Sequence, residues 1–256
     1  MPKRYRAGVI GRTGRGNYGH GLDRVYLEME EVDIVAVADD DPAGLEEAGQ
    51  RLGVERLYAD YREMLKNEWF DIVSICPRWL DQHAEMVFAV AEAGACIFLE
   101  KPIARTLAEA DAMIETCEKA GIMMGMAHQG RMHAAAHHAK QLLLEGVLGD
   151  IISIQMHGKE DRRGGGEDLM VLGTHLFDML RFLLGRNPYW VYGSVTTSKG
   201  QSITGADADE GPEELGLITG ESIHALYGFG NGVTATFETR RDQPSHAFRY
   251  GMWIYG

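Results

Sequence analysis

The sequence has little positive charge and no long hydrophobic run. Its 25 lysine and arginine residues face 38 aspartate and glutamate residues, which gives a formal net charge of −13. This acidity argues against a protein that binds nucleic acid or anionic membranes through charge. No apolar segment approaches the length of a membrane span, and the first residues lack the apolar core of a signal peptide. We therefore expect a cytoplasmic protein with neither a nucleic-acid nor a membrane partner.

Cysteine is also scarce, and its spacing excludes two kinds of site. Cys76, Cys96 and Cys117 form no CxxC pair, so we expect reduced thiols rather than a disulfide framework. His133 and His137 lie four residues apart, as zinc ligands on a helix do, but no cysteine or carboxylate follows at matching spacing. The sequence therefore predicts no metal site, and solvated or substrate-facing histidines instead.

The first half of the chain alternates apolar runs with amphipathic segments. Apolar runs without polar alternation, each followed by a helix, predict a parallel sheet that is covered on both faces. The runs are residues 6–11, 32–38, 70–76, 95–100 and 122–127. We expect a doubly wound α/β domain over residues 1–127, with a helix directly after the first run that buries Leu22, Val25, Tyr26 and Met29.

The second half changes character. Helices are expected at 134–145 and 175–184, and partly alternating strands follow, two of them joined by the hairpin signal Gly-Asn-Gly at 230–232. The polar, glycine-rich residues 198–216 are expected to form a mobile loop. The pattern predicts an α+β domain with a mostly antiparallel, open sheet over residues 128–256.

A glycine-rich turn, GVIGRTGRGNYG, follows the first apolar run. Its glycines permit a tight turn and a close approach of the backbone to a pyrophosphate. Thr13 stands where the G-x-G-x-x-G pattern has its middle glycine; its Cβ crowds the turn, although its hydroxyl could donate to phosphate. Although such a loop can be only structural, its context favours a dinucleotide site. The candidate cofactor-binding residues are Gly11, Arg12, Thr13, Gly14, Arg15 and Gly16.

Asp39 ends the second apolar run. A carboxylate at this place accepts hydrogen bonds from adenosine ribose hydroxyls and repels a 2′-phosphate. The sequence therefore favours NAD over NADP.

Residues 71–110 resemble the signature region of the Gfo/Idh/MocA family of oxidoreductases, which includes glucose–fructose oxidoreductase and inositol dehydrogenase. The resemblance rests on Pro77, His83, Gly94 and the tripeptide Glu100-Lys101-Pro102. The segments GVLGDI at 146–151 and GGGEDLMVLGTHLFDMLRFLLG at 164–185 resemble motifs of the family's second domain.

The resemblance implies a Rossmann domain followed by a substrate-binding α+β domain whose open sheet joins subunits in a dimer or tetramer. It also implies a nicotinamide cofactor, contacted by Pro77, His83, Glu100 and Lys101, and a sugar or polyol substrate. Family members extend past the point where this chain ends, so the resemblance suggests a C-terminal truncation.

Two residues are expected to carry the chemistry. Lys101 ends a buried parallel strand, the edge at which ligands bind in such sheets, and could take the proton of a substrate hydroxyl. Burial and the positive nicotinamide would both disfavour its charged form. Without the family context, the same charges could be a surface ion pair. The resemblance gives His175 contact with the substrate hydroxyl, whereas Asp178, one turn later, is expected to anchor a buried hydrogen bond.

The sequence departs from the family at Val171. Many catalytic members carry an aspartate four residues before the histidine, and valine can neither orient a histidine nor accept a proton. Glu167 and Asp168 lie nearby and could substitute.

Three arginines are candidates for substrate contacts. Arg131 resembles a family arginine that lines the substrate pocket, and Arg162 with Arg163 could clamp an acidic group or could be solvated. We expect an NAD-dependent sugar or polyol dehydrogenase. The alternatives are a glycosidase or epimerase that uses NAD transiently and a non-catalytic protein that senses NAD or a sugar.

Overall fold

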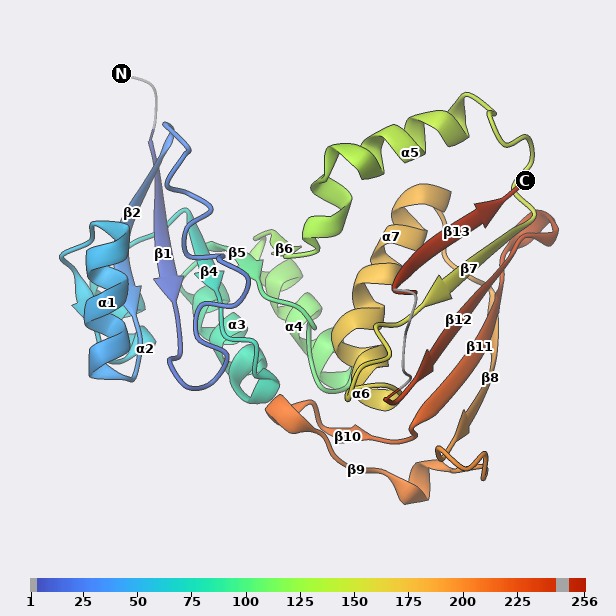
Figure 1. Cartoon of the computed structure of the whole chain (residues 1–256). Helices are drawn as coiled ribbons and strands as arrows, with labels where there is room; N and C mark the ends of the chain where they lie inside the picture. The colour runs from blue at the N-terminus through green and yellow to red at the C-terminus, as the bar shows by residue number, and fades with distance from the viewer. Residues whose placement is uncertain (1–3, 243–248) are drawn as a thin grey trace. The chain divides into compact units, whose positions relative to one another are not determined.

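The computed structural model describes residues 4–242 and 249–256. The chain forms two compact units: the described residues of Met1–Ala127 with Glu213–Leu215, and those of His128–Pro212 with Gly216–Gly256. Figure 1 shows the elements of each unit. Within the described ranges, no helix has both the length and the apolar character that crossing a membrane requires.

The first unit is built on one parallel sheet of six strands in the order β3-β2-β1-β4-β5-β6. This is the strand order of a dinucleotide-binding Rossmann fold and confirms the predicted fold class. The strands are β1 Tyr5–Ile10, β2 Val32–Ala38, β3 Leu57–Tyr58, β4 Ile72–Ile75, β5 Cys96–Leu99 and β6 Met124–Met126. The helices are α1 Pro42–Leu52, α2 Tyr61–Asn67, α3 His83–Glu92 and α4 Leu107–Ala120.

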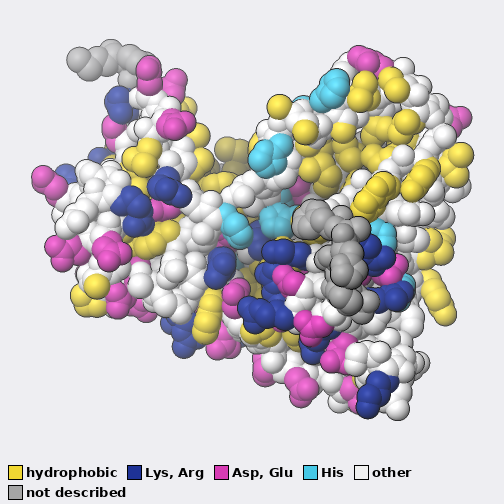
Figure 2. Space-filling view, in the orientation of Figure 1, with side chains coloured by type: hydrophobic (Ala, Val, Ile, Leu, Met, Phe, Trp, Pro, Cys, Tyr) yellow, Lys and Arg dark blue, Asp and Glu magenta, His cyan; other side chains and the backbone are white. Residues whose placement is uncertain are grey.

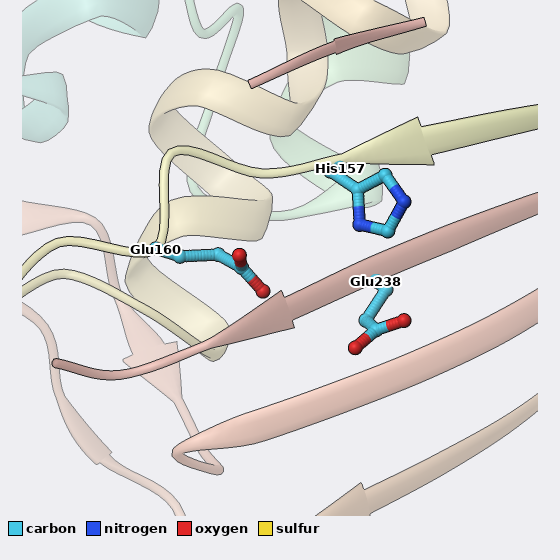
Figure 3. Close-up of side chains that lie close together, drawn as sticks. All are labelled: His157, Glu160 and Glu238. Atoms are coloured by element: carbon cyan, nitrogen blue, oxygen red, sulfur yellow. The ribbon is translucent and has the colours of Figure 1, made fainter. Parts of the chain in front are cut away.

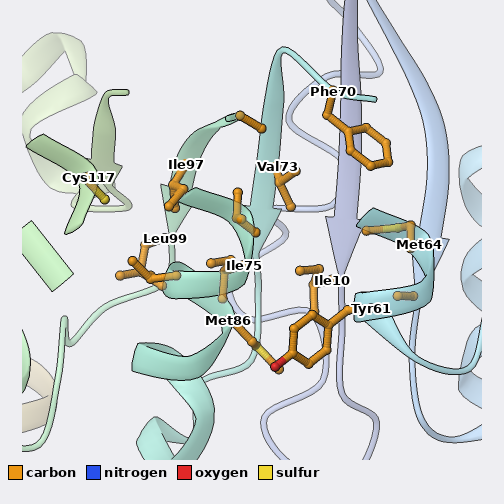
Figure 4. Close-up of a cluster of buried hydrophobic side chains, with 14 of the residues drawn as sticks. Ile10, Tyr61, Met64, Phe70, Val73, Ile75, Met86, Ile97, Leu99 and Cys117 are labelled. Atoms are coloured by element: carbon orange, nitrogen blue, oxygen red, sulfur yellow. The ribbon is translucent and has the colours of Figure 1, made fainter. Parts of the chain in front are cut away.

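Both faces of this sheet are buried because successive strand residues point to opposite sides. Ile10 and Ile75 pack with Met64 of α2 and Met86 of α3 in one cluster (Figure 4). The neighbouring residue Val9 belongs instead to a second cluster, with residues of α1. This two-sided burial explains why the strands read as continuous apolar runs.

The prediction of a helix directly after β1 is wrong. Residues 12–31 form successive tight turns, most of them closed by a hydrogen bond over three residues, and Arg12 pairs with Asn17 in a short antiparallel bridge. Four glycines in this stretch, Gly14, Gly16, Gly19 and Gly21, have positive φ, which a right-handed helix does not allow. Accordingly, the predicted buried face is incomplete: Leu22 and Tyr26 are buried, whereas Val25 and Met29 are exposed.

The second unit contains a five-stranded sheet in the order β13-β7-β12-β11-β8. Only the β12–β7 pair is parallel, which confirms the mostly antiparallel sheet. The strands are β7 Ser153–His157, β8 Trp190–Thr196, β11 Ser222–Gly228, β12 Thr234–Arg240 and β13 Gly251–Tyr255. The helices are α5 Ala134–Leu144, α6 Gly166–Asp168 and α7 Thr174–Leu184.

Helix α7 covers one face of this sheet. Leu176 and Leu180 of α7 pack on Ile154, Met156 and Phe237 of the sheet. A π-helical segment, Leu169–Gly173, joins α6 to α7.

The stretch predicted as a loop, residues 198–216, contains structure. The short strands β9 Asp209–Glu210 and β10 Leu217–Ile218 pair in an antiparallel fashion, and Leu215 between them is 1% exposed.

Candidate active site

Glu100, the first residue after β5, is fully buried and held by three donors. Its carboxylate accepts hydrogen bonds from the backbone N–H of His20 at 2.8 Å and of Lys101 at 3.0 Å. The Nδ1 atom of His20 lies 3.0 Å from both carboxylate oxygens. Burial raises the pKa of Glu100, but the hydrogen bonds and charge of His20 outweigh it, so the pKa is lowered. The carboxylate is therefore ionised at neutral pH.

His20 was not recognised as a site residue from the sequence. Its neighbour Gly19 has a φ of +58°, and a Cβ there would overlap the Glu100 carboxylate and the Cys76 carbonyl. Only glycine therefore lets this turn bring His20 onto Glu100. The Gly-His-Gly sequence at 19–21 was the available signal, but its partner lies 80 residues away.

Lys101 is 2% exposed and precedes Pro102, to which it is joined by a cis peptide bond. The carboxyl end of β5 thus carries two buried ionisable side chains, Glu100 and Lys101. Ionisable side chains are rarely buried outside functional sites unless other groups compensate their charge. Glu100 and Lys101 lie at the edge of the sheet where Rossmann folds bind their ligands.

Pro77, which follows the neighbouring strand β4, and His83, the first residue of α3, lie beside this edge. The ring nitrogens of His83 lie 2.7 Å from the carbonyl oxygen of Pro77 and 3.2 Å from that of Ile103. Burial lowers the pKa of His83, against the opposing effect of the two carbonyl groups. His83 connects the end of β4 to the segment after Pro102, and its predicted contact with a cofactor stays a prediction.

The glycine-rich turn is fastened to the end of β2. Asp39 accepts hydrogen bonds from the backbone N–H and the hydroxyl of Thr13, the latter at 2.8 Å. Tyr18 donates its hydroxyl to Asp39 at 2.8 Å. Arg12 pairs with Asp40 and, at 2.7 Å, with Asp81.

A pocket of about 260 Å³ opens beside this turn. Its walls include Gly11, Arg12, Asp40 and Tyr61. The Tyr61 hydroxyl is buried without a hydrogen-bond partner among the described residues, and Gly14 of the turn has a φ of +80° with open space where a Cβ would lie. An open glycine and an unsatisfied buried hydroxyl fit a dinucleotide, which has phosphates for the turn and polar atoms for the pocket.

In the second unit, His175 is the second residue of α7. Its ring packs edge-on against the ring of His128, with centroids 5.6 Å apart. Val171 lies in the π-helical segment before α7, so the family's aspartate has no counterpart at that position.

Asp168, one of the two nearby carboxylates, is completely buried, and its Oδ2 atom accepts hydrogen bonds from the Thr239 hydroxyl and from the backbone N–H of Glu160. Its Oδ1 atom has no hydrogen-bond partner among the described residues. Its carboxylate therefore fastens α6 to β12 and to the segment after β7.

Among the arginine candidates, Arg131 forms a two-pronged ion pair with Asp178, with Nε at 2.8 Å from Oδ2. The hydrogen bond and charge of Asp178 raise the pKa of Arg131. This pair confirms the buried anchor predicted for Asp178. Arg162 is exposed, whereas Arg163 pairs with Asp161 at 2.7 Å.

A further cluster lies where β7 and β12 end. Candidate ligand atoms of His157, Glu160 and Glu238 lie within 4.8 Å of one another (Figure 3). However, Arg249 donates to both oxygens of Glu160 at 2.8 Å and to Glu238 at 3.3 Å, and Arg240 lies 2.9 Å from Glu238. The carboxylates are compensated by guanidinium groups, which favours an ion-pair network over a metal site.

The sequence matches known protein families over most of its length. Residues 5–128 match a family described as oxidoreductases with an NAD-binding Rossmann fold, and residues 136–256 match the GFO/IDH/MocA C-terminal domain. D-apiose dehydrogenase from Paraburkholderia graminis is 32% identical over 196 residues, which are 72% of this chain and 50% of that protein. Myo-inositol 2-dehydrogenase from Thermotoga maritima is 26% identical over 88% of this chain and 71% of its own length.

Solved structures agree in fold. An oxidoreductase from Agrobacterium radiobacter, in complex with NAD⁺, L-tartaric acid and magnesium, superposes with a TM-score of 0.76. The match covers 99% of this chain and 72% of that one, at 20% identity. The chain thus spans half the length of D-apiose dehydrogenase and 71% of the length of myo-inositol 2-dehydrogenase. With both domains matched in order along nearly all of its residues, the chain belongs to the GFO/IDH/MocA family of oxidoreductases.

Proposed function

We propose that this protein is an NAD-dependent oxidoreductase that transfers a hydride between nicotinamide and a hydroxyl group of a sugar or polyol. The observation that carries the proposal is the buried Glu100–Lys101 pair at the carboxyl end of β5, joined through His20 to the glycine-rich turn. The names of the relatives support the substrate class, since they include D-apiose, myo-inositol 2- and levoglucosan dehydrogenases.

Each residue then has a defined task. The glycine-rich turn and the pocket beside it would hold the cofactor, and NAD⁺ bound there would supply the acceptor for the hydride of the carbinol carbon. The Nζ atom of Lys101 accepts the proton of the same hydroxyl group. Glu100 fixes the backbone at Lys101 and the ring of His20. The residues that we assign to substrate contacts are Arg131, Arg162 and His175.

The direct test is production of NADH from NAD⁺ with a panel of sugars and polyols, followed by absorbance. Lys101→Ala should abolish turnover while NADH binding, measured by fluorescence, persists. Lys119→Ala is the matched control, because Lys119 is exposed and its described ion pair is with Glu115, one turn earlier. Turnover that survives Lys101→Ala would refute the assigned proton acceptor.

Two other outcomes would replace the proposal. Cleavage or epimerisation of a sugar without net NADH would indicate that the cofactor is used transiently. Dinucleotide binding with no turnover on any substrate would indicate a sensing protein.

We also propose that the outer face of the second unit's sheet joins subunits into a homo-oligomer. Phe177 of α7 contacts Tyr227 and Phe237, so their strand neighbours point away from α7. Strand pairing aligns a row across that outer face: Tyr192, Leu226, Thr236, Gln155 and Trp253.

The row presents aromatic side chains to solvent, with Tyr192 76% and Trp253 42% exposed. Hydrophobic side chains also gather over α5 (Figure 2), where Leu144 is 74% exposed. Exposed apolar patches of this kind mark interaction surfaces. Light scattering of the purified chain should give a dimer or tetramer, and Tyr192→Arg should dissociate it; a monomeric parent chain would refute the interface. A cytoplasmic location stays a prediction of the sequence.

A further inference from the structure

The carboxylate of Asp39 is fully engaged by the chain itself. Asp39 is 2% exposed and accepts hydrogen bonds from four groups: the N–H and hydroxyl of Thr13, the hydroxyl of Tyr18 and the N–H of Asp41. A carboxylate offers about four lone-pair positions. A ribose hydroxyl would therefore have to displace one of these donors before it could bind Asp39.

The most constrained of these donors is Tyr18. Its ring lies directly against Gly11, where a Cβ would overlap the ring. The guanidinium of Arg51 lies 4.7 Å from the ring centroid and is itself fixed by two hydrogen bonds to the buried Asp23. Because both the ring and the hydroxyl of Tyr18 are fixed, a ligand could not easily displace this donor from Asp39.

The next residue has the opposite character. The Asp40 side chain is 59% exposed, and its described hydrogen bond is a single one, from Arg12 at 3.3 Å. Both Asp39 and Asp40 line the pocket beside the glycine-rich turn, so the difference between them lies in exposure and in the number of internal donors. Tyr61 lines the same pocket and is 8% exposed, and its hydroxyl has no hydrogen-bond partner in the described part of the chain.

We propose that Asp39 is a positioning residue that locks the glycine-rich turn, and that Asp40 and the Tyr61 hydroxyl bind the adenosine end of the dinucleotide. This proposal rests on the proposed use of NAD. According to this proposal, Asp40 rather than Asp39 is the carboxylate that repels the 2′-phosphate of NADP. Arg12 is held beside the pocket by Asp81 as well as by Asp40, so removal of the Asp40 charge would leave a guanidinium where a 2′-phosphate could pair with it.

Fluorescence titrations of the full chain with NADH and with NADPH test the assignment, together with thermal unfolding. Asp40→Asn should change the ratio of the two dissociation constants at least tenfold in favour of NADPH and leave the unfolding midpoint in place. Tyr61→Phe should weaken both dinucleotides several-fold. Tyr18→Phe keeps the ring but removes a donor to Asp39, so it should weaken both dinucleotides equally, leave their ratio unchanged and lower the midpoint.

The opposite pattern would overturn the proposal. If Asp39 binds the ribose, Asp39→Asn changes the ratio of the NADH and NADPH dissociation constants and Asp40→Asn does not. If Asp39→Asn unfolds the chain, an unchanged ratio in Asp40→Asn is by itself enough to overturn the proposal. Binding of NADH without turnover would reject the oxidoreductase and leave this assignment standing. A parent chain that binds neither dinucleotide would overturn both.

Discussion

The turn that carries His20 gives the sharpest test of how this site is held. Gly19→Ala places a methyl group against the Glu100 carboxylate and within 2.5 Å of the Cys76 carbonyl oxygen, at a φ of +58°. The residue must also adopt the left-handed conformation, which costs a non-glycine residue about 1–2 kcal/mol. Gly53 is the matched control, because its φ is +67° and a Cβ there meets nothing within 4 Å.

The magnitudes separate the two variants. Gly53→Ala should cost only the backbone term, about 1–2 kcal/mol. Gly19→Ala must in addition move Glu100 away from His20, and each hydrogen bond to a charged group is worth about 1.5–3 kcal/mol. We therefore expect Gly19→Ala to exceed the control by about 3 kcal/mol in the free energy of unfolding.

Denaturant unfolding of the parent chain and both variants, followed by circular dichroism, measures the difference. The same preparations can be titrated with NADH, for which Gly19→Ala should lose affinity and Gly53→Ala should not. Equal destabilisation by the two substitutions would refute the reasoning, because it would show that the Glu100 contact contributes nothing beyond the backbone conformation.

Two further predictions concern ion pairs. The pKa of Glu100 is lower in the folded chain than in the unfolded chain, so ionised Glu100 stabilises the fold above its unfolded pKa, and this stabilisation is lost as the pH falls through the folded pKa. The difference in unfolding free energy between the parent and Glu100→Gln should therefore be constant near neutral pH and shrink in acid. A difference that grows in acid would contradict this. Arg131→Gln strands the 8%-exposed Asp178 without its partner, whereas Asp178→Asn leaves an arginine that solvent reaches. Unfolding curves should therefore show a larger loss for Arg131→Gln, and the reverse order would contradict the assignment.

The first sheet could be predicted from the sequence because its strands are buried on both faces. Val9 and Ile10 lie in hydrophobic clusters on opposite faces of the sheet, so every residue at the end of the strand is apolar. A helix after most of the strands then gives the alternation that predicts a parallel sheet. The same reasoning failed at residues 12–31. Apolar spacing there suggested a helix, but glycines at positive φ dictate turns, and their backbone preference outweighs the periodicity.

The site was predictable only in part, for a related reason. Glu100 and Lys101 could be found because charges interrupt an apolar strand. His20 and Tyr61 could not, because their roles depend on contacts or cavities made by residues far apart in the chain. Such contacts follow from the fold and leave no spacing to recognise.

Exposure separates the structural carboxylates from those that can bind a ligand. The sequence singled out Asp39 and Asp168, one at the end of β2 and one near the histidine of α7. The structure leaves them 2% and 0% exposed, and donors from the chain bind both oxygens of Asp39 and the Oδ2 atom of Asp168. A buried carboxylate is costly unless donors satisfy it, so a fold that buries such a group must bind it internally, and its charge then organises the backbone around the ligand. Asp40, one residue further and mostly exposed, keeps the lone pairs that a ribose needs. Position along the chain suggests where a ligand binds; solvent access and the count of internal donors indicate which carboxylate is available to it.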